Sequence, residues 1–181
     1  YTSGYLYSFY IYYPTGIRCN GNTANNNYCG YYMYTFYLYY GSVGTYTWNE
    51  FQDNTITKNT SVSYNYSAYI YYYNGTNNFK INRNYCVGNT CTGSTGYHYF
   101  YLYYLNNYEV IGNVVAGNYA NSQYIYVYSG ISGTFTSEIR NNTFQANTTT
   151  APTPGSSYIY CYLYQYYHTV SFTGNIIDLK G

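Results

Sequence analysis

Charged side chains are scarce in this chain. Only 6% of its 181 residues are Asp, Glu, Lys or Arg, and the formal net charge is +1. Electrostatic capture of nucleic acid or of an anionic membrane therefore has little to act through. Long apolar runs are also missing, because polar residues interrupt every hydrophobic stretch before it reaches the length of a membrane span. We expect neither a nucleic-acid partner nor membrane insertion.

Targeting signals are absent as well. No signal peptide is visible, and the chain begins with Tyr1 rather than methionine, which indicates a mature or excised segment. Scarce charge with abundant Asn, Thr and Ser is also found in disordered chains, but such chains lack aromatic residues. Aromatic residues make up 25% of this sequence, so we expect an ordered fold.

Helical periodicity is absent too. Apolar residues do not recur at i, i+3, i+4 and i+7, and the apolar runs are short and alternating. Tyr, Ile, Val, Phe and Thr dominate these runs, while Gly, Asn, Ser and Thr fill the gaps, which is typical of strands joined by turns. Leucine-rich and propeller signatures are also missing, which excludes two common repeat architectures.

A Tyr-aliphatic-Tyr triplet occurs six times in the chain. Side chains alternate across a strand, so both tyrosines of a triplet point away from the face that its aliphatic residue occupies. Stacked copies predict two outward columns of tyrosines. The triplets are Tyr10-Ile11-Tyr12, Tyr37-Leu38-Tyr39, Tyr69-Ile70-Tyr71, Tyr101-Leu102-Tyr103, Tyr126-Val127-Tyr128 and Tyr162-Leu163-Tyr164.

A second motif, hydrophobe-x-x-Asn-x-hydrophobe, follows each triplet in the same order. Successive asparagines of this motif lie 32, 30, 29, 29 and 33 residues apart, which is the period of a solenoid. We expect these asparagines to form an internal ladder with amides hydrogen-bonded between coils, because buried amides must be satisfied. They are Asn22, Asn54, Asn84, Asn113, Asn142 and Asn175.

Together the two motifs predict an all-β fold, a right-handed parallel β-helix solenoid of six coils with about 30 residues per coil. Segments 51–56 and 139–144 resemble the strand-turn-strand repeat of the pectin-lyase-like β-helix proteins, whose asparagines stack in a ladder at an interior turn. We expect one domain, 1–181, with coils at approximately 1–27, 28–61, 62–93, 94–120, 121–154 and 155–181.

Catalytic groups do not converge in the sequence. Enzymes of the pectin-lyase-like architecture carry clustered Asp, Lys and Arg on one outer sheet, and this chain lacks that cluster. Glu109 and Glu138 fall on adjacent coils and meet the spacing of a glycosidase pair, but Arg140 is a better salt-bridge partner than a catalytic group. We expect no enzymatic activity and no cofactor. Metal binding is also unexpected, because there is no CxxC pair and His98 and His168 lie in separate coils.

One outward column concentrates charge. The residue before the first hydrophobe of the asparagine motif is charged in five of the six coils, and opposite charges stacked on a sheet stabilise its register by about 0.2–1 kcal/mol each. An ordinary solvated face is an equally good interpretation. The column comprises Arg18, Glu50, Lys80, Glu109, Glu138 and Ser171.

Five N-glycosylation sequons favour an extracellular or cell-surface location. Asn59, Asn65, Asn74 and Asn147 fall between the repeat motifs, where a glycan has room to project, and Asn141 precedes the ladder residue Asn142. A chain rich in Asn and Thr also generates sequons by chance.

The cysteines allow two local disulfides in an oxidising compartment. Cys86 with Cys91 and Cys19 with Cys29 are the candidate pairs, with Cys29 and Cys91 in loops. Cys19, Cys86 and Cys161 fall on inward positions, where a cysteine also serves as a small buried hydrophobe.

The tyrosine columns and the chain ends favour a structural role. A contiguous aromatic face marks an interaction surface for other subunits or for glycans, unless other segments cover it. Eleven positions lead from the start of the chain to Ile11, and four residues follow Ile177. Their sum, fifteen, falls within the 12 to 19 residues that separate the last hydrophobe of one coil from the centre of the next tyrosine triplet. A head-to-tail contact that does not close builds a fibre. We therefore predict an extracellular homopolymeric filament. A carbohydrate-binding surface domain is the second interpretation, and a polysaccharide-degrading enzyme is the third.

Overall fold

The computed structural model describes residues 3–14, 16–39, 48–71, 78–129, 134–147, 157–163 and 168–180. Within its strands the side chains of residues 129, 147, 157, 161–163, 168 and 180 are not described. These residues form 21 strands, and no segment among them is a helix. No helix long and apolar enough to cross a membrane occurs in these ranges.

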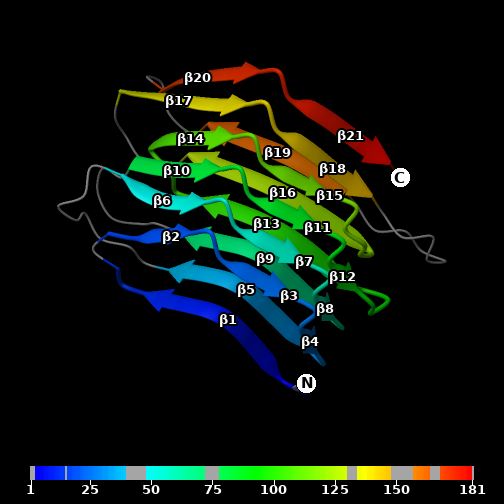
Figure 1. Cartoon of the computed structure of the whole chain (residues 1–181). Coiled ribbons are helices and arrows are strands. Elements are labelled where there is room, and N and C mark those ends of the chain that lie inside the picture. Colours follow the sequence, from blue (N-terminus) through cyan, green and yellow to red (C-terminus); the bar gives the residue numbers. More distant parts are fainter. Residues whose placement is uncertain are drawn as a thin grey trace.

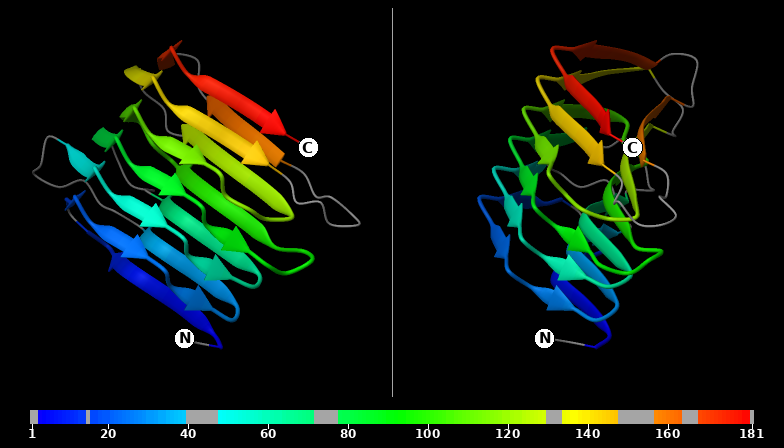
Figure 2. Two further views of the ribbon diagram at one scale, coloured as in Figure 1. Left: turned by 45° about the vertical axis from the view of Figure 1, so that its right-hand side comes forward. Right: turned by 90° about the vertical axis from the view of Figure 1, so that its right-hand side faces the viewer.

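The strands form four parallel sheets that wind along one axis. Figures 1 and 2 show the chain advancing coil by coil from β1 at one end to β20 and β21 at the other. The tyrosine sheet comprises β1 (Tyr5–Tyr12), β5 (Tyr32–Tyr39), β9 (Tyr64–Tyr71), β13 (Tyr97–Tyr103), β16 (Ser122–Ser129) and β19 (Ser157–Leu163). The charged sheet comprises β2 (Arg18–Asn20), β6 (Asn49–Gln52), β10 (Asn78–Asn82), β14 (Asn107–Ile111), β17 (Phe135–Arg140) and β20 (His168–Thr173).

The third sheet follows the charged sheet in every coil, and a short sheet follows it in the first three. The third sheet comprises β3 (Thr23–Asn25), β7 (Thr55–Thr57), β11 (Tyr85–Val87), β15 (Val114–Ala116), β18 (Thr143–Asn147) and β21 (Ile176–Lys180). The short sheet comprises β4 (Tyr28–Cys29), β8 (Thr60–Ser61) and β12 (Thr90–Cys91). This arrangement confirms the predicted all-β parallel solenoid.

A left-handed residue turns the chain between the charged and third sheets. The residue before each ladder asparagine has a positive φ, from 55° at Arg83 and Asn141 to 66° at Gly21. Glycine reaches this conformation without strain, and asparagine and aspartate tolerate it better than most residues. The six turn residues are Gly21, Asp53, Arg83, Gly112, Asn141 and Gly174.

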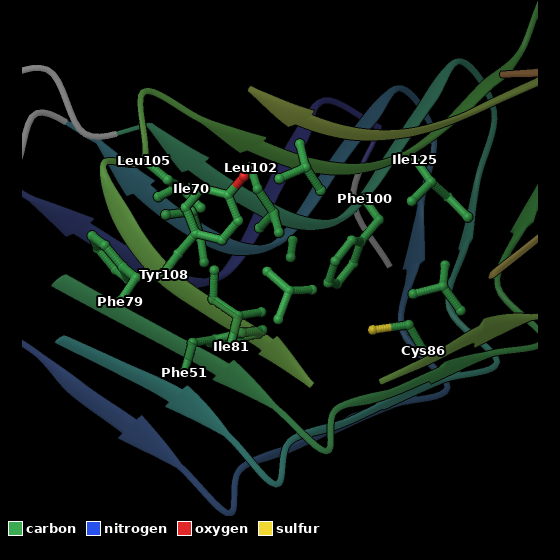
Figure 3. Close-up of a cluster of buried hydrophobic side chains, with 14 of the residues drawn as sticks. Phe51, Ile70, Phe79, Ile81, Cys86, Phe100, Leu102, Leu105, Tyr108 and Ile125 are labelled. Carbon is green, nitrogen blue, oxygen red and sulfur yellow. The ribbon is translucent and has the colours of Figure 1, made fainter. Parts of the chain in front are cut away.

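The core lies between the sheets and consists of stacked apolar columns. Phe51, Ile81, Val110 and Ile139 succeed one another in register on the charged sheet, each no more than 3% exposed. Figure 3 shows residues from this column and from the tyrosine sheet, such as Ile70 and Leu102, pointing toward one another. Full burial of such a side chain contributes about 1.5–3 kcal/mol, so each coil adds to a continuous core.

The sixth tyrosine triplet is shifted by two residues from its predicted position. Val127 pairs with Cys161 and Tyr128 with Tyr162, so the sixth copy is Tyr160-Cys161-Tyr162. Leu163 pairs with Ser129, and Tyr164 lies outside the described residues. Strands have a period of two, so a shift of two residues keeps the backbone positions of this strand in the same alternation.

A bulge separates the first three tyrosine strands from the fourth. Tyr99 pairs with Tyr66 whereas the next residue, Phe100, pairs with Ala68, which leaves Ser67 as the extra residue. Ser67 is fully buried. The tyrosines on its two sides, Tyr66 and Tyr69, are therefore three residues apart, whereas Tyr99 and Tyr101 are two apart.

The tyrosine face as a candidate interaction surface

The outer side of the tyrosine sheet carries four columns of tyrosines rather than the predicted two. In the first five coils the third and fourth columns hold the predicted residues in register, while in the sixth coil Tyr160 and Tyr162 take these positions in place of Tyr162 and Tyr164. The first and second columns were not predicted from the sequence. The first column is Tyr5, Tyr32, Tyr64 and Tyr97; the second is Tyr7, Tyr34, Tyr66, Tyr99, Tyr124 and Tyr158; the third is Tyr10, Tyr37, Tyr69, Tyr101, Tyr126 and Tyr160; the fourth is Tyr12, Tyr39, Tyr71, Tyr103 and Tyr128, with the backbone of Tyr162 next in register.

Rings stack on one another within the second, third and fourth columns, whereas Tyr32 in the first column meets Tyr5 and Tyr64 edge to face, at 86° and 77°. Along the third column the centroids of successive rings are 5.2, 5.0, 5.1, 5.0 and 4.9 Å apart, and successive planes differ by 2° to 14°. Offset stacking of this kind adds about 0.5–1.5 kcal/mol per pair beyond area burial. Each inner ring thus uses its faces on its neighbours and presents mainly its edge and hydroxyl outward.

The second and third columns meet edge to face. Tyr34 and Tyr37 have centroids 5.1 Å apart with planes at 83°, and Tyr66 and Tyr69 are 5.5 Å apart at 87°. The positive edge of one ring therefore contacts the negative face of the next. The columns form one connected array across the sheet.

Burial keeps the inner phenols protonated. Desolvation, together with the smaller effect of the neighbouring phenol of Tyr7, raises the pKa of Tyr34 to about 12. The pKa values of Tyr66, Tyr69 and Tyr101 are also raised, first by desolvation and then by adjacent tyrosines. A phenolate is disfavoured here because it loses water contacts and repels neighbouring phenolates. A tyrosine of ordinary pKa is already uncharged at neutral pH, and the raised pKa values keep these inner phenols uncharged at higher pH as well.

The predicted asparagine ladder is confirmed. Oδ1 of Asn84 accepts hydrogen bonds from the backbone N–H and the Nδ2–H of Asn54, at 3.1 and 2.9 Å. Nδ2 of Asn84 donates to the carbonyl of Phe51 and to Oδ1 of Asn113, both at 2.9 Å. The same pattern links Asn113 to Asn142. Every hydrogen-bonding group of the inner amides is thus satisfied.

A second asparagine ladder runs beside the first and was missed. Asn27, Asn59, Asn89 and Asn118 are linked from Nδ2 to Oδ1 at 2.8 to 3.0 Å. Each follows a first-ladder asparagine by five residues, and Lys58, Gly88 and other left-handed residues precede them. This fixed spacing is a signal from which the sequence alone predicts the second ladder.

The charged column is in register as predicted. Arg18 pairs with Glu50, Glu50 with Lys80, and Lys80 with Glu109. Arg18 Nε lies 3.7 Å from Glu50, and Lys80 Nζ lies 4.0 Å from Glu109. Pairs of this length on an outer face contribute at most about 1 kcal/mol each.

Two glycosylation candidates are corrected. Asn59 and Asn65 are fully buried, and their side chains bond to neighbouring coils rather than projecting from loops. A glycan has no room at either position in this fold. Asn141 is an exposed turn residue, and Asn147 ends β18 with its side chain not described. Asn74 lies outside the described residues.

The disulfide candidates are also corrected. Cys19, Cys29, Cys86 and Cys91 are free thiols. Cys29 and Cys91 lie buried in β4 and β12 rather than in loops, and the Cys91 thiol donates to backbone carbonyls. Cys86 packs in the hydrophobic core, where burial raises its pKa. The two candidate partners thus occupy different strands and different environments. The backbone of Cys161 holds the inward register position opposite Val127.

The structure places the other titratable residues that were singled out from the sequence, Glu109, Glu138, Arg140 and His98. Glu109 and Glu138 are neighbours in register, and Arg140 Nε contacts Glu138 at 2.8 Å. His98 is buried against Ser67 Oγ at 2.9 Å, and burial lowers its pKa to about 3. No group of three metal-ligating side chains occurs in the part of the chain that the structure describes. The side chain of His168 is not described.

Comparison of the chain with protein-family models, with curated proteins and with solved structures found no match. The parallel solenoid is established by the pairing of its own strands. Membership of the pectin-lyase-like group stays a prediction.

Proposed function

We propose that this chain is a structural, non-catalytic protein that assembles head to tail into extracellular filaments with an ordered tyrosine face. The observation that carries the proposal is the polarity of the asparagine ladder. Its amides all point the same way, so the two outer coils offer opposite and complementary groups.

The ladder groups at the two ends match each other. Asn22 donates its backbone N–H and Nδ2–H to Asn54, at 3.0 and 2.9 Å, and its own Oδ1 accepts no hydrogen bond from the described residues. Asn175 accepts from Asn142 at 3.0 and 2.8 Å, while its backbone N–H finds no partner among the described residues. Stacking coil one of a second copy on coil six therefore reproduces the internal bonding pattern.

The apolar columns also match across such a junction. Phe172 and Ile177 end two core columns and are 48% and 46% exposed, whereas their predecessors Ile139 and Phe144 are nearly fully buried. Cys19 and Ala24 begin the same columns at the other end. Placing these small residues over the large ones covers exposed apolar surface, and free sheet edges favour added strands.

Two variants with opposite blocked ends test the assembly. Phe172→Asp should prevent pairing at coil six, and Cys19→Asp should prevent it at coil one, because each places a carboxylate in the apolar junction. Each variant alone should sediment as a monomer, while an equal mixture should form dimers and nothing longer. Thr173→Asp, which adds the same charge on the exposed side of β20, is the matched control and should still polymerise.

Sedimentation velocity over a range of concentrations, with electron microscopy of the wild type, gives the readout. Circular dichroism checks that each variant retains its strands. A wild-type chain that stays at 21.0 kDa at millimolar concentration removes the filament proposal. Polymers that persist in Phe172→Asp would also remove it.

The stacking of the rings bears on the alternative, a carbohydrate-binding domain. Aromatic sugar sites use exposed ring faces, whereas the inner rings of the third column have their faces against neighbouring rings. This geometry favours the structural role. A glycan array that shows micromolar binding by the monomer, abolished by Tyr69→Ala, would favour the alternative.

A further inference from the structure

We propose that the tyrosine face is a site of oxidative coupling, where one-electron oxidation joins tyrosines of neighbouring coils by carbon–carbon bonds between their rings. The oxidant is hydrogen peroxide used by a haem peroxidase. This inference rests on the arrangement of tyrosines within one chain and not on filament assembly.

The first support is proximity. In the third column each ring lies 4.9 to 5.2 Å, centroid to centroid, from the ring of the next coil, and no other residue type interrupts the column. Two neighbouring phenols therefore need only rotate their ring planes to bring the ortho carbons together. Parallel register fixes this proximity along the whole face.

The second support is the rigidity of the backbone beneath the rings. The aliphatic residues between the tyrosines, such as Ile70 and Leu102, are at most 1% exposed and packed in the core. Holding two reactants in fixed proximity raises their effective concentration by orders of magnitude over free encounter. Coupling between tyrosines of one chain should therefore be faster than coupling between separate molecules.

The third support is access for an oxidant. Tyr10 is 55% exposed and Tyr160 is 41% exposed, so both ends of the third column meet solvent. The inner rings are partly exposed along the outer face. When one phenol loses an electron, the phenols stacked on it are the nearest groups that can react with the radical.

The chemistry balances with one peroxide per bond. Each of two phenols loses one electron and its hydroxyl proton to give a tyrosyl radical. The two radicals couple through their ortho ring carbons, and each of these carbons then loses its hydrogen as a proton while the phenol oxygen regains one. The peroxide takes up the two electrons and two protons and leaves as two molecules of water.

The test treats dilute, folded monomer with a haem peroxidase and hydrogen peroxide and identifies coupled peptides by mass spectrometry. The expected products are pairs from one column on adjacent coils, above all Tyr37 with Tyr69 and Tyr69 with Tyr101, each having lost two hydrogen atoms. Biphenol fluorescence should exceed that of the urea-unfolded chain several-fold at equal concentration.

Two substitutions test whether the coupling takes place within the third column. Tyr69→Phe keeps the stacked ring but lacks the phenol, so both pairs that include position 69 should disappear while Tyr101 still couples to Tyr126. Tyr85→Phe is the matched control: Tyr85 is 47% exposed on the third sheet, with Thr55 and Val114 as its neighbours in register. It should leave the product pattern unchanged.

Two results would overturn the proposal. One is a folded protein that couples no more than the unfolded chain, and the other is a product mixture dominated by links between molecules or by pairs that are not adjacent. Because the readout uses monomer, either result leaves the filament proposal standing. Failure of filament assembly likewise leaves this one intact.

Discussion

Asparagine stacks well at the inner turn because its side chain is short and carries both an acceptor and donors. Oδ1 of Asn113 accepts two hydrogen bonds from Asn84, and Nδ2 of Asn113 donates to the carbonyl of Ile81 and to Asn142. Aspartate would offer the acceptor without the donors and would bury a charge. Glutamine would place the amide too far from the turn.

Replacing one inner ladder residue should be costly. Asn113→Ala removes the acceptor of the backbone N–H and of one Nδ2–H of Asn84, and it removes the side-chain donor to the carbonyl of Ile81, all in a fully buried site. We expect the free energy of unfolding to fall by about 3 kcal/mol or more, because each orphaned buried group costs about 1–3 kcal/mol.

Urea unfolding followed by circular dichroism measures this loss. Asn25→Ala, at an exposed position with one hydrogen bond from Thr57, is the control and should change stability by less than about 0.5 kcal/mol. Equal effects of the two substitutions would contradict the ladder's role in stability.

The first ladder was predictable from the sequence because its asparagines recur between hydrophobic residues at a fixed distance from an apolar strand. Asn59 was wrongly placed in a surface loop because it is not flanked by hydrophobic residues. It follows Lys58 and precedes Thr60 in a polar run that is typical of a surface loop, yet it turns inward. Only the chain-wide spacing of five residues from the first ladder distinguishes it from a loop asparagine.

At the scale of the elements, each corner joins two strands through one left-handed residue. The native residue at this position is glycine in three coils and Asp53, Arg83 or Asn141 in the others. Arg83 compensates for its strain by a paired hydrogen bond to Asp53, with Nε and Nη2 at 2.7 and 2.8 Å from the carboxylate oxygens. Side-chain contacts between coils thus offset an unfavourable backbone.

Substitutions at Gly112 isolate the backbone contribution. A Cβ there would meet only Cγ of Arg83 at 3.6 Å, an ordinary contact, while φ is +65°. Gly112→Val should destabilise by about 1–2 kcal/mol through backbone strain. Gly112→Asn should be nearly neutral, since asparagine occupies the equivalent turn at position 141. Urea midpoints give the comparison, and equal losses for Val and Asn would argue against a conformational origin.

Strand register was predictable in five coils and not in the sixth. Tyrosines at 158, 160, 162 and 164 alternate without interruption, so a shift of two residues keeps the same alternation along the strand. The run Tyr158 to Tyr162 matches Tyr124 to Tyr128 almost residue for residue, which was the available signal. The second column was hidden because the bulge at Ser67 changes its spacing from the third.

For the whole molecule, the raised phenol pKa values predict alkaline unfolding. An unfolded tyrosine ionises near pH 10, whereas burial raises the pKa of Tyr34 to about 12 and shifts Tyr66, Tyr69 and Tyr101 upward as well. The folded state binds the phenol proton more tightly. Stability from this source is therefore complete below pH 10 and is lost as pH rises through the folded-state values.

We expect cooperative loss of strand signal above about pH 11, with most phenolate absorbance at 295 nm appearing in the same transition. The urea-unfolded chain should instead titrate smoothly near pH 10. Phenolate absorbance that develops fully near pH 10 while the strands persist would contradict the buried array.

The overall architecture was predictable because a solenoid repeats one local pattern, so each motif is observed six times. The fate of the disulfide and glycosylation candidates was not predictable, because it depends on which side chains from different coils meet. Cys86 and Cys91 are close in sequence yet belong to different strands, and Asn65 is a sequon whose side chain faces inward.

The ladders have an electrical consequence. Five side-chain amides of the first ladder and three of the second donate an N–H toward coil six, and the amide oxygens that accept these bonds face coil one. An amide dipole is about 3.5 D, while the backbone dipoles of sheets contribute little. The aligned amides add up to an axial moment that is positive toward coil six. A rod of net charge +1 should therefore still turn in an electric field, and rods lying side by side should favour opposite directions.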